Sequence, residues 1–559
     1  MHRILLSIFM LILLPSLTGR GMGVGLLFAQ INTQRMMDIG RNALYFDDYA
    51  LSIQYFNQVI AAKPYLHEPY FYRALAKFYL EDYTGAERDC SEAIRINPFY
   101  PNTYEVRGLS RINLGRYADA AEDYAQATEV QPNNRAAWHN WVLCNIELDS
   151  LQRADSIASV LIRKWPKNAD GYAMKSQIRL AQQDTVQAET WVDSALVADR
   201  YHVPSLSMKS SLLMHRQQWA DADTMLTEAI RLQPKHVQNH VQRALARYHQ
   251  MNLRGAMADY DFAIDLDPTN FVGHYNRGLL RAQVGEDNAA IEDFDFILRI
   301  DPDDVMALYN RAELLMETGD YRGAIRDYTA LIKIYPNFLQ GYLRRAQARR
   351  QTGDIRGAQR DEEHVLREQV AHRYGYASKA SRTATTRKKS EVNLEEYQKL
   401  VVDDEEEKQY ESEYRGKIQN RDAELRPLPP LSVPDYQLVI VPSDTARAAF
   451  TAGLEHLLVE EYEPAITALT IAIDHAPNFA EAYYNRAYAL MKTHKVKSAI
   501  DDLTEAIRLR PRFSQAFFNR GIILIQNGQA ADAIPDLSMA GELGIYEAYS
   551  IIKHNTPKK

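Results

Sequence analysis

Proline recurs every 34 residues within three runs of this 559-residue chain. Because proline lacks an N–H group and clashes with a preceding helical turn, each copy marks the end of a helix. A constant interval of this length indicates a tandem array in which each unit is one pair of helices. The prolines are Pro64, Pro98, Pro132, Pro166, Pro234, Pro268, Pro302, Pro336, Pro477 and Pro511.

Other residue types recur in the same frame when each proline is given repeat position 32. Position 8 is small, position 20 is nearly always alanine, position 24 is mostly large, and glycine recurs at position 15. Positions 8 and 20 would let two helices approach closely, and a glycine would turn the chain between them. Neither helix would be stable alone, so stacking on neighbouring repeats must bury the remaining apolar face.

The pattern, clearest from Ala480 to Phe513, resembles the tetratricopeptide repeat family. The resemblance implies an all-α fold, a right-handed α-solenoid of about 13 helix-turn-helix repeats. Ten repeats are expected in residues 33–372 and three in 446–547. Proline is replaced by Arg200, Val370 and Ile545 at three repeat ends, where we expect looser or extended junctions.

Arginine at position 7 and aspartate at position 23 occur together. Since these positions lie at the same level of an antiparallel helix pair, we predict ion pairs that clamp the two helices. The alternative is an arginine that reaches for a ligand. The expected pairs are Arg73–Asp89, Arg107–Asp123, Arg243–Asp259, Arg277–Asp293, Arg311–Asp327, Arg345–Asp361, Arg486–Asp502 and Arg520–Asp536.

Residues 373–443 interrupt the array with a basic stretch, an acidic stretch and then four prolines between Pro427 and Pro434. This composition is typical of a flexible or partly helical linker. The alternative is that the acidic or proline-rich part docks into the chain's own groove or onto a partner. Residues 548–559 form a C-terminal cap and tail, whose apolar spacing predicts a helix over the last repeat.

Residues 1–29 have the pattern of an export signal, with a short charged start, an apolar run and Ala29 before the expected cleavage point. This predicts an exported, periplasmic protein of a bacterial cell envelope. The alternative is that the segment is retained and anchors the protein to the inner membrane.

The sequence shows no catalytic constellation, so we expect no enzyme activity and no cofactor. His236 and His240 are four residues apart but lack a third ligand nearby, so no metal site is expected. A net charge of −8 does not suit a nucleic-acid backbone. Cys90 and Cys144 fall at apolar helix positions and are expected to be buried.

The resemblance places the binding surface on the concave face, which the first helix of each repeat lines. Aromatic residues at position 5 and asparagines at position 6 would there grip an extended peptide, because an amide can both donate and accept hydrogen bonds. The alternative is that they only support the superhelix. The candidate groove residues are Tyr275, Asn276, Tyr309, Asn310, Tyr484, Asn485, Phe518 and Asn519.

These features together predict a non-catalytic scaffold that binds protein or peptide ligands in the concave groove, with possible peripheral association with an envelope complex. The alternative function is a permanent structural or assembly subunit of an envelope secretion or surface-assembly machine. An exposed apolar convex patch would favour the alternative, whereas a wet groove of aromatic and amide side chains favours the scaffold.

Overall fold

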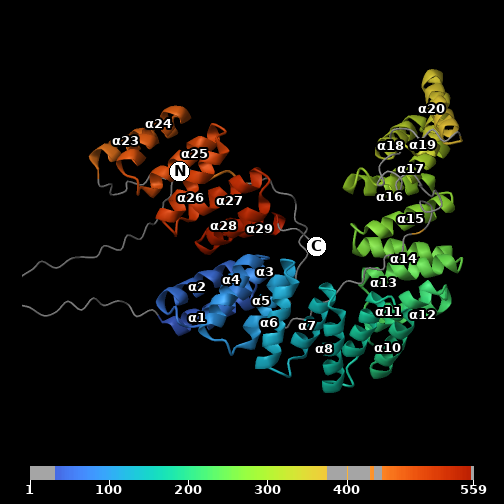
Figure 1. The fold of residues 1–559 in the computed structure, drawn as a ribbon, viewed down its shortest axis with the longest axis horizontal. Coiled ribbons are helices and arrows are strands. Elements are labelled where there is room, and N and C mark those ends of the chain that lie inside the picture. Colours follow the sequence, from blue (N-terminus) through green and yellow to red (C-terminus); the bar gives the residue numbers. More distant parts are fainter. Residues whose placement is uncertain (1–31, 374–399, 401–428, 433–442, 556–559) are drawn as a thin grey trace, which may run out of the picture. The chain divides into compact units, whose positions relative to one another are not determined.

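A computed structural model describes residues 32–373, 400, 429–432 and 443–555 of the chain, and these residues form helices and no strand (Figure 1). The predicted export signal lies outside the described residues, as does most of the predicted insertion. The helices follow one another in pairs, which confirms an α-solenoid of helix-turn-helix repeats.

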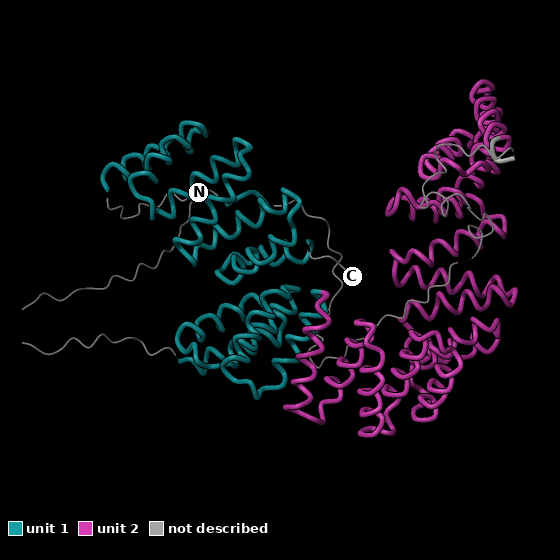
Figure 2. Tube along the Cα trace, in the orientation of Figure 1, with its two compact units in different colours: residues 1–114, 414–559 teal, residues 115–413 magenta. Residues whose placement is uncertain are grey.

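The described chain divides into two compact units (Figure 2). Unit 1 combines the first repeats with the last ones, and unit 2 is the stretch between them. Unit 1 contains α1 (Thr33–Tyr45), α2 (Tyr49–Ala62), α3 (Glu68–Tyr79), α4 (Tyr83–Ile96), α5 (Pro101–Asn113), α23 (Asp444–Leu458), α24 (Tyr462–His475), α25 (Ala480–Lys492), α26 (Val496–Leu509), α27 (Ser514–Gln526), α28 (Ala530–Glu542) and α29 (Glu547–Asn555).

Unit 2 is continuous in sequence and consists of ordinary helix pairs apart from its first and last members. It contains α6 (Tyr117–Val130), α7 (Arg135–Glu147), α8 (Leu151–Lys164), α9 (Asp170–Ala181), α10 (Thr185–Ala198), α11 (Val203–His215), α12 (Trp219–Leu232), α13 (Val237–His249), α14 (Leu253–Leu266), α15 (Phe271–Gln283), α16 (Asp287–Ile300), α17 (Val305–Thr318), α18 (Tyr321–Ile334), α19 (Leu339–Gln351) and α20 (Ile355–Arg373).

Every repeat turns between its helices through one residue with a positive φ angle, at position 15. Five repeats place glycine there, for example Gly319 at +87°. The other eight place a residue with a side chain there, such as Met251 at +60°, although this conformation costs an L-residue about 1–2 kcal/mol. The turn geometry is therefore imposed by the packing of the helices and not by glycine alone.

Small residues at positions 8 and 20 bring the two helices together, as the sequence predicts. A side-chain carbon added to Gly40 at position 8 would lie 2.7 Å from the ring of Phe56 at position 24. The alanines at position 20 are completely buried, and Ala86 and Ala324 are examples. The large residue at position 24 of each repeat thus fills the space beside the small residues at positions 8 and 20.

The predicted arginine–aspartate clamps form within both units. In each, Nε and Nη2 of the arginine donate to the two carboxylate oxygens at 2.6–3.0 Å. Arg107 and Asp123 belong to different units, and that pair stays a prediction. The pairs observed are Arg73–Asp89, Arg243–Asp259, Arg277–Asp293, Arg311–Asp327, Arg345–Asp361, Arg486–Asp502 and Arg520–Asp536.

The same arginines make a third contact that the sequence pattern did not predict. The remaining Nη1 donates to a polar side chain that lies 16 residues earlier, on the second helix of the preceding repeat. Arg311, for example, reaches Asp295 at 2.6 Å, and Arg486 reaches Thr470 at 3.1 Å. One guanidinium therefore ties together three helices from two successive repeats.

Removing the carboxylate of a clamp should destabilise the array, because it leaves a half-buried guanidinium without its main partner. We expect Asp327→Ala to lower the free energy of unfolding by about 3 kcal/mol, measured as a shift in the midpoint of urea unfolding. Glu505→Ala is the matched control, since the Glu505–Arg508 pair lies on the surface and should leave the midpoint unchanged. Equal effects of the two substitutions would contradict the clamp.

Within unit 1, the last helices pack against the first ones. The side chains of Tyr549 and Ile552 on α29 share one apolar cluster with Ile53 on α2 and Ala76 on α3. The predicted C-terminal helix therefore does cover the last repeat, and it also covers repeats that lie more than 400 residues earlier in the chain.

A buried cluster of charges holds this contact, which we call the latch. Its centre is Glu542 at the end of α28, whose carboxylate lies 2.8 Å from Nζ of the completely buried Lys77 and 2.6 Å from Arg88. Lys77 also contacts Asp89, the clamp partner of Arg73. Beside the cluster, Ser538 donates a hydrogen bond to Asp82 at 2.6 Å.

The surrounding cations decide the charge state of the latch. Burial alone would raise the pKa values of Asp89 and Glu542, but the neighbouring Arg73 and Lys77 hold both below their usual ranges. Burial raises the pKa of Asp82, and Lys77 offsets this only in part. Asp89 and Glu542 thus favour the folded form at neutral pH, whereas Asp82 opposes it.

The latch should weaken in acid. The folded protein holds Asp89 and Glu542 ionised, so their stabilisation is present above their unfolded pKa values of about 4 and is lost as pH falls below them. Protonation of Asp82 has the opposite sign and offsets part of this loss. We expect the hydrogen-exchange protection factors of amides in α29, which are corrected for the intrinsic exchange rate at each pH, to fall between pH 5 and pH 3.

Glu542→Gln tests the same contact at neutral pH. It should cost on the order of 3 kcal/mol of unfolding free energy in unit 1 and should flatten the pH dependence. Urea unfolding followed at several pH values measures both effects. A variant that keeps the pH slope of the parent protein would show that the latch does not control it.

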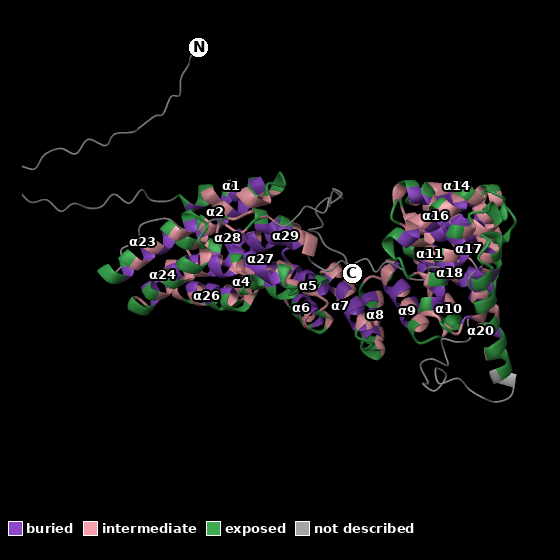
Figure 3. Cartoon of the chain, turned by 90° about the horizontal axis from the view of Figure 1, so that it is seen from above, coloured by how far each residue is buried: buried purple, intermediate pink, exposed green. Residues whose placement is uncertain are grey.

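The final helix of unit 2 continues beyond the expected repeat end. α20 runs through position 32, because Val370 stands there in place of the proline that ends other second helices. Ile355, Leu366 and Val370 are exposed apolar residues of this helix. Figure 3 shows exposed residues along α20. The extended junction predicted for this repeat is confirmed.

Candidate functional site

The candidate groove residues lie on first helices at repeat positions 5 and 6, within α15, α17, α25 and α27. All eight are buried in the folded chain. The aromatic rings therefore fill space between helices and do not project freely into a groove. They are Tyr275, Asn276, Tyr309, Asn310, Tyr484, Asn485, Phe518 and Asn519.

The structure joins two tyrosine–asparagine pairs across adjacent repeats, which we call rungs. The side-chain amide of Asn310 donates to the hydroxyl of Tyr275 at 3.3 Å, and that of Asn519 donates to the hydroxyl of Tyr484 at 3.1 Å. Position 6 of one repeat thus meets position 5 of the repeat before it. Each rung fixes the orientation of an asparagine at the bottom of the concave face.

The other four candidate residues take no part in the two hydrogen bonds that form the rungs. Phe518 packs into the apolar cluster around α28 and α29, beside Leu537. Tyr309 packs into the cluster of α17 and α18 and meets the ring of Phe338 edge-on. Asn276 and Asn485 are completely buried. The alternative reading, in which the aromatic residues support the superhelix, describes Phe518 and Tyr309.

The rung of unit 1 holds a piece of the chain's own backbone. The amide of Ser432 donates to Oδ1 of Asn519 at 2.7 Å, and Nδ2 of Asn519 donates back to the carbonyl of Ser432 at 3.3 Å. The hydroxyl of Tyr484 donates to the same carbonyl at 3.1 Å. One asparagine therefore satisfies both backbone groups of one residue, and the tyrosine holds that asparagine in place.

The residue before Ser432 supplies an apolar contact. Leu431 packs against the core of α25 and α26 and also against the core of α27 and α28. Its side chain therefore lies at the junction of the last two repeats. The segment Pro429–Ser432 (the docked segment) belongs to the proline-rich stretch for which the sequence allowed self-docking.

Unit 2 carries a polar pocket that the sequence analysis missed. It is lined from α7, α9, α11 and α13 and has a volume of about 110 Å³. Nε2 of His202 lies 2.9 Å from Asp170; burial raises the pKa of that carboxyl, but the hydrogen bond with His202 lowers it to about 2. Two buried amide atoms that line it, Nδ2 of Asn239 and Oε1 of Gln242, have no hydrogen-bond partner among the described residues.

A donor and an acceptor on one concave surface suit a peptide backbone, as in the rung of unit 1. Only polar residues at repeat positions 3 and 6 could have signalled this pocket from the sequence. Asparagine and glutamine are common on the surfaces of helices in general, so their presence at these two positions did not indicate a pocket.

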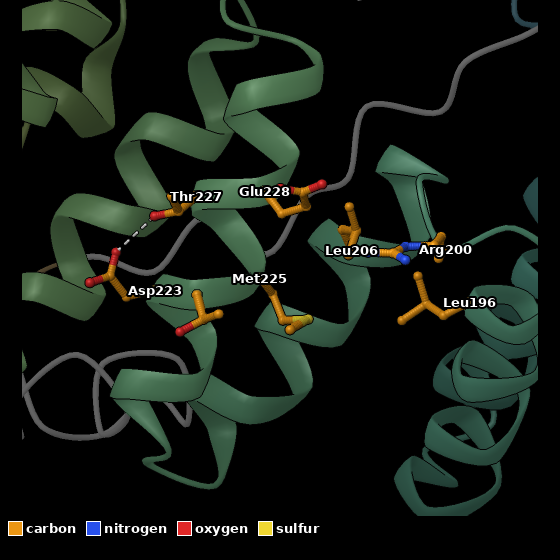
Figure 4. Close-up of a pocket in the computed structure, with 8 residues that line it drawn as sticks. Leu196, Arg200, Leu206, Asp223, Met225, Thr227 and Glu228 are labelled. Carbon is orange, nitrogen blue, oxygen red and sulfur yellow. Dashed lines mark hydrogen bonds between the residues drawn. The ribbon is translucent and has the colours of Figure 1, made fainter.

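A second pocket marks the junction where Arg200 replaces proline. It is open, with a volume of about 610 Å³, and lies between the end of α10 and helices α11 and α12. Figure 4 shows Arg200 and Leu196 facing Met225 and Glu228 across it. The backbone at Arg200 nevertheless turns through the same two hydrogen bonds as the junction at Pro234, at 2.8 and 3.2 Å, so the looser junction expected at this repeat end is not observed.

In the described ranges, no group of three or more histidine, cysteine, aspartate or glutamate residues could hold a metal ion. His236 caps the start of α13, and Nε2 of His240 contacts the carbonyl of Pro234 at 2.9 Å. Cys90 and Cys144 are buried. None of the described helices has the length and apolar character that a membrane crossing requires.

Several solved structures resemble parts of this chain. A tetratricopeptide repeat protein from Parabacteroides merdae is 15% identical over 42% of this chain and 92% of its own, with a TM-score of 0.31. PilF of Pseudomonas aeruginosa is 17% identical over 36% and 92%, with a TM-score of 0.34. TTC0263 of Thermus thermophilus is 18% identical over 30% and 92%, with a TM-score of 0.27.

No curated protein matches the sequence significantly. Two family models do, and both describe the tetratricopeptide repeat. One matches residues 305–338, and the other matches residues 106–154, 450–502 and 485–541. The matches lie in both units and coincide with the helix pairs described above. The matched parts of this chain are therefore tetratricopeptide repeats.

Proposed function

We propose that this protein is a non-catalytic scaffold that binds extended segments of partner proteins on its concave face. The observation that carries the proposal is the contact with Ser432, where one asparagine side chain pairs with both the N–H and the carbonyl of a single residue. Tetratricopeptide repeats are in general protein-binding scaffolds, and the family is in general non-catalytic.

The rung explains why an amide side chain at position 6 is suited to binding the backbone of an extended segment. A backbone unit presents one donor and one acceptor, and burying either without a partner costs about 1–3 kcal/mol. Asn519 matches both, and Tyr484 adds a second donor to the carbonyl. The polar pocket of unit 2, with its unpartnered amide atoms, offers a second concave surface of the same chemistry.

We further propose that the protein acts in a bacterial cell envelope, exported to the periplasm. The support is the apolar pattern of residues 1–29. Retention of that segment as an inner-membrane anchor is the alternative. Fractionation of cells that produce the full chain, with mass spectrometry of its N-terminus, distinguishes a cleaved periplasmic form from an uncleaved membrane-bound one.

One observation favours the alternative function, a permanent subunit of an envelope assembly. Leu366 and Val370 lie one turn apart near the end of α20, and both are exposed. In an assembly, this apolar pair would be covered by a neighbouring subunit. Leu366→Lys with Val370→Lys would then release the protein from a complex that otherwise survives purification.

The scaffold proposal is tested by crosslinking in cells, followed by purification of the protein with its captured partners. Asn310→Ala with Asn519→Ala should reduce partner capture, because each change removes paired hydrogen bonds worth about 2 kcal/mol, or roughly 30-fold in affinity. Asn527→Ala is the matched control, since this exposed amide lies beyond the end of α27.

Urea unfolding of the double variant provides the folding control. If the folded double variant captures the same partners as the parent protein and the Asn527→Ala control, recognition lies outside the two rungs and the proposed site is wrong.

A further inference from the structure

We propose that the docked segment, Pro429–Ser432, is an intramolecular competitor for the groove of the last two repeats, and that the partner presents a segment of the same chemistry. That chemistry is an extended peptide in which proline precedes an aliphatic residue, followed by a residue with a free backbone N–H. The inference rests on the proposed function of the groove as a peptide-binding surface.

The polar part of the recognition is directed at the backbone. The contacts of Ser432 with the rung use its amide nitrogen and its carbonyl oxygen. Any residue other than proline offers the same two groups at this position. The groove therefore tolerates different side chains here, but it requires an N–H.

The apolar part of the recognition selects the preceding residue. Leu431 is half-buried and lies against the cores of α25–α26 and α27–α28 together. An aliphatic side chain at this point removes apolar surface of both repeats from water. A charged side chain would lose that contact and would have to be desolvated.

The two prolines prepare the backbone for this contact. Proline fixes its own φ near −65° and favours an extended conformation in the residue before it, so Pro429 and Pro430 restrict the free segment to extended forms. A segment that is already extended loses less conformational entropy on docking. Pro430 is exposed, which indicates that this residue acts through chain stiffness more than through burial.

The tether makes such a small contact effective. Residues 433–443 alone connect Ser432 to the start of α23, so the segment cannot move far from the groove. Tethers of this length give effective concentrations on the order of millimolar. A segment of millimolar intrinsic affinity would then fill the groove about half of the time, and a partner of micromolar affinity would displace it.

The competitor can be tested in the full-length protein with one backbone substitution and its matched control. Ser432→Pro removes the N–H that Asn519 accepts, whereas Ser432→Ala keeps both backbone groups. The probe is a fluorescent synthetic peptide with the sequence of residues 425–436, and its binding is followed by fluorescence polarisation.

We expect the parent protein and Ser432→Ala to bind the probe equally weakly. Ser432→Pro should bind it about twofold more tightly, because a groove that is filled half of the time by its own segment has half its intrinsic affinity for the probe. Leu431→Asp in the full chain should likewise tighten binding of the probe. A second peptide with proline at the position of Ser432 should bind none of the proteins. Neither residue belongs to a repeat helix, and unchanged urea unfolding would verify that the repeats are intact.

The possible failures are distinct. Equal, tight binding of the probe to all four proteins would show that the groove accepts peptides but that the docked segment does not compete, which overturns this inference alone. Absence of binding to Ser432→Pro and Leu431→Asp, with the repeats intact, would show that the groove does not bind this peptide class and would overturn the proposed function of the site as well.

Discussion

In the repeats that carry it, the arginine at position 7 is the interaction that holds the two helices together and joins them to the preceding repeat. Its planar guanidinium offers donors in fixed directions, two to the aspartate 16 residues later and one to the polar side chain 16 residues earlier. A lysine could not satisfy this geometry, because its ammonium group is a single point of charge. One arginine side chain therefore fixes how the two helices of a repeat pack together and how that repeat packs on the one before it.

Much of the repeat could be predicted because its constraints recur. The small residues at positions 8 and 20, the turn at position 15 and the clamp each appear in many copies, so a pattern such as Arg311 with Asp327 stands out. The third contact of the arginine was missed, since position 25 holds asparagine, serine, threonine or aspartate in different repeats and any of these accepts a hydrogen bond.

Features that occur once leave no such trace. Glu542 forms its ion pairs with residues more than 450 positions earlier, and nothing in its own repeat distinguishes it from a surface glutamate. The rungs could be anticipated from the adjacent tyrosine and asparagine positions. The docking of Ser432 could not be anticipated, because the groove contacts its backbone groups, and every residue except proline has the same backbone groups.

The latch has a consequence for the order in which the protein can mature. Ile53 on α2 and Ala76 on α3 lie in one apolar cluster with residues of α27, α28 and α29, and Ile552 of α29 is synthesised 476 residues after Ala76. At about 5–20 residues per second, that interval lasts roughly 25 to 95 seconds. Unit 2 has all its residues before unit 1 does, so the unit that begins first along the chain is the last that can be completed.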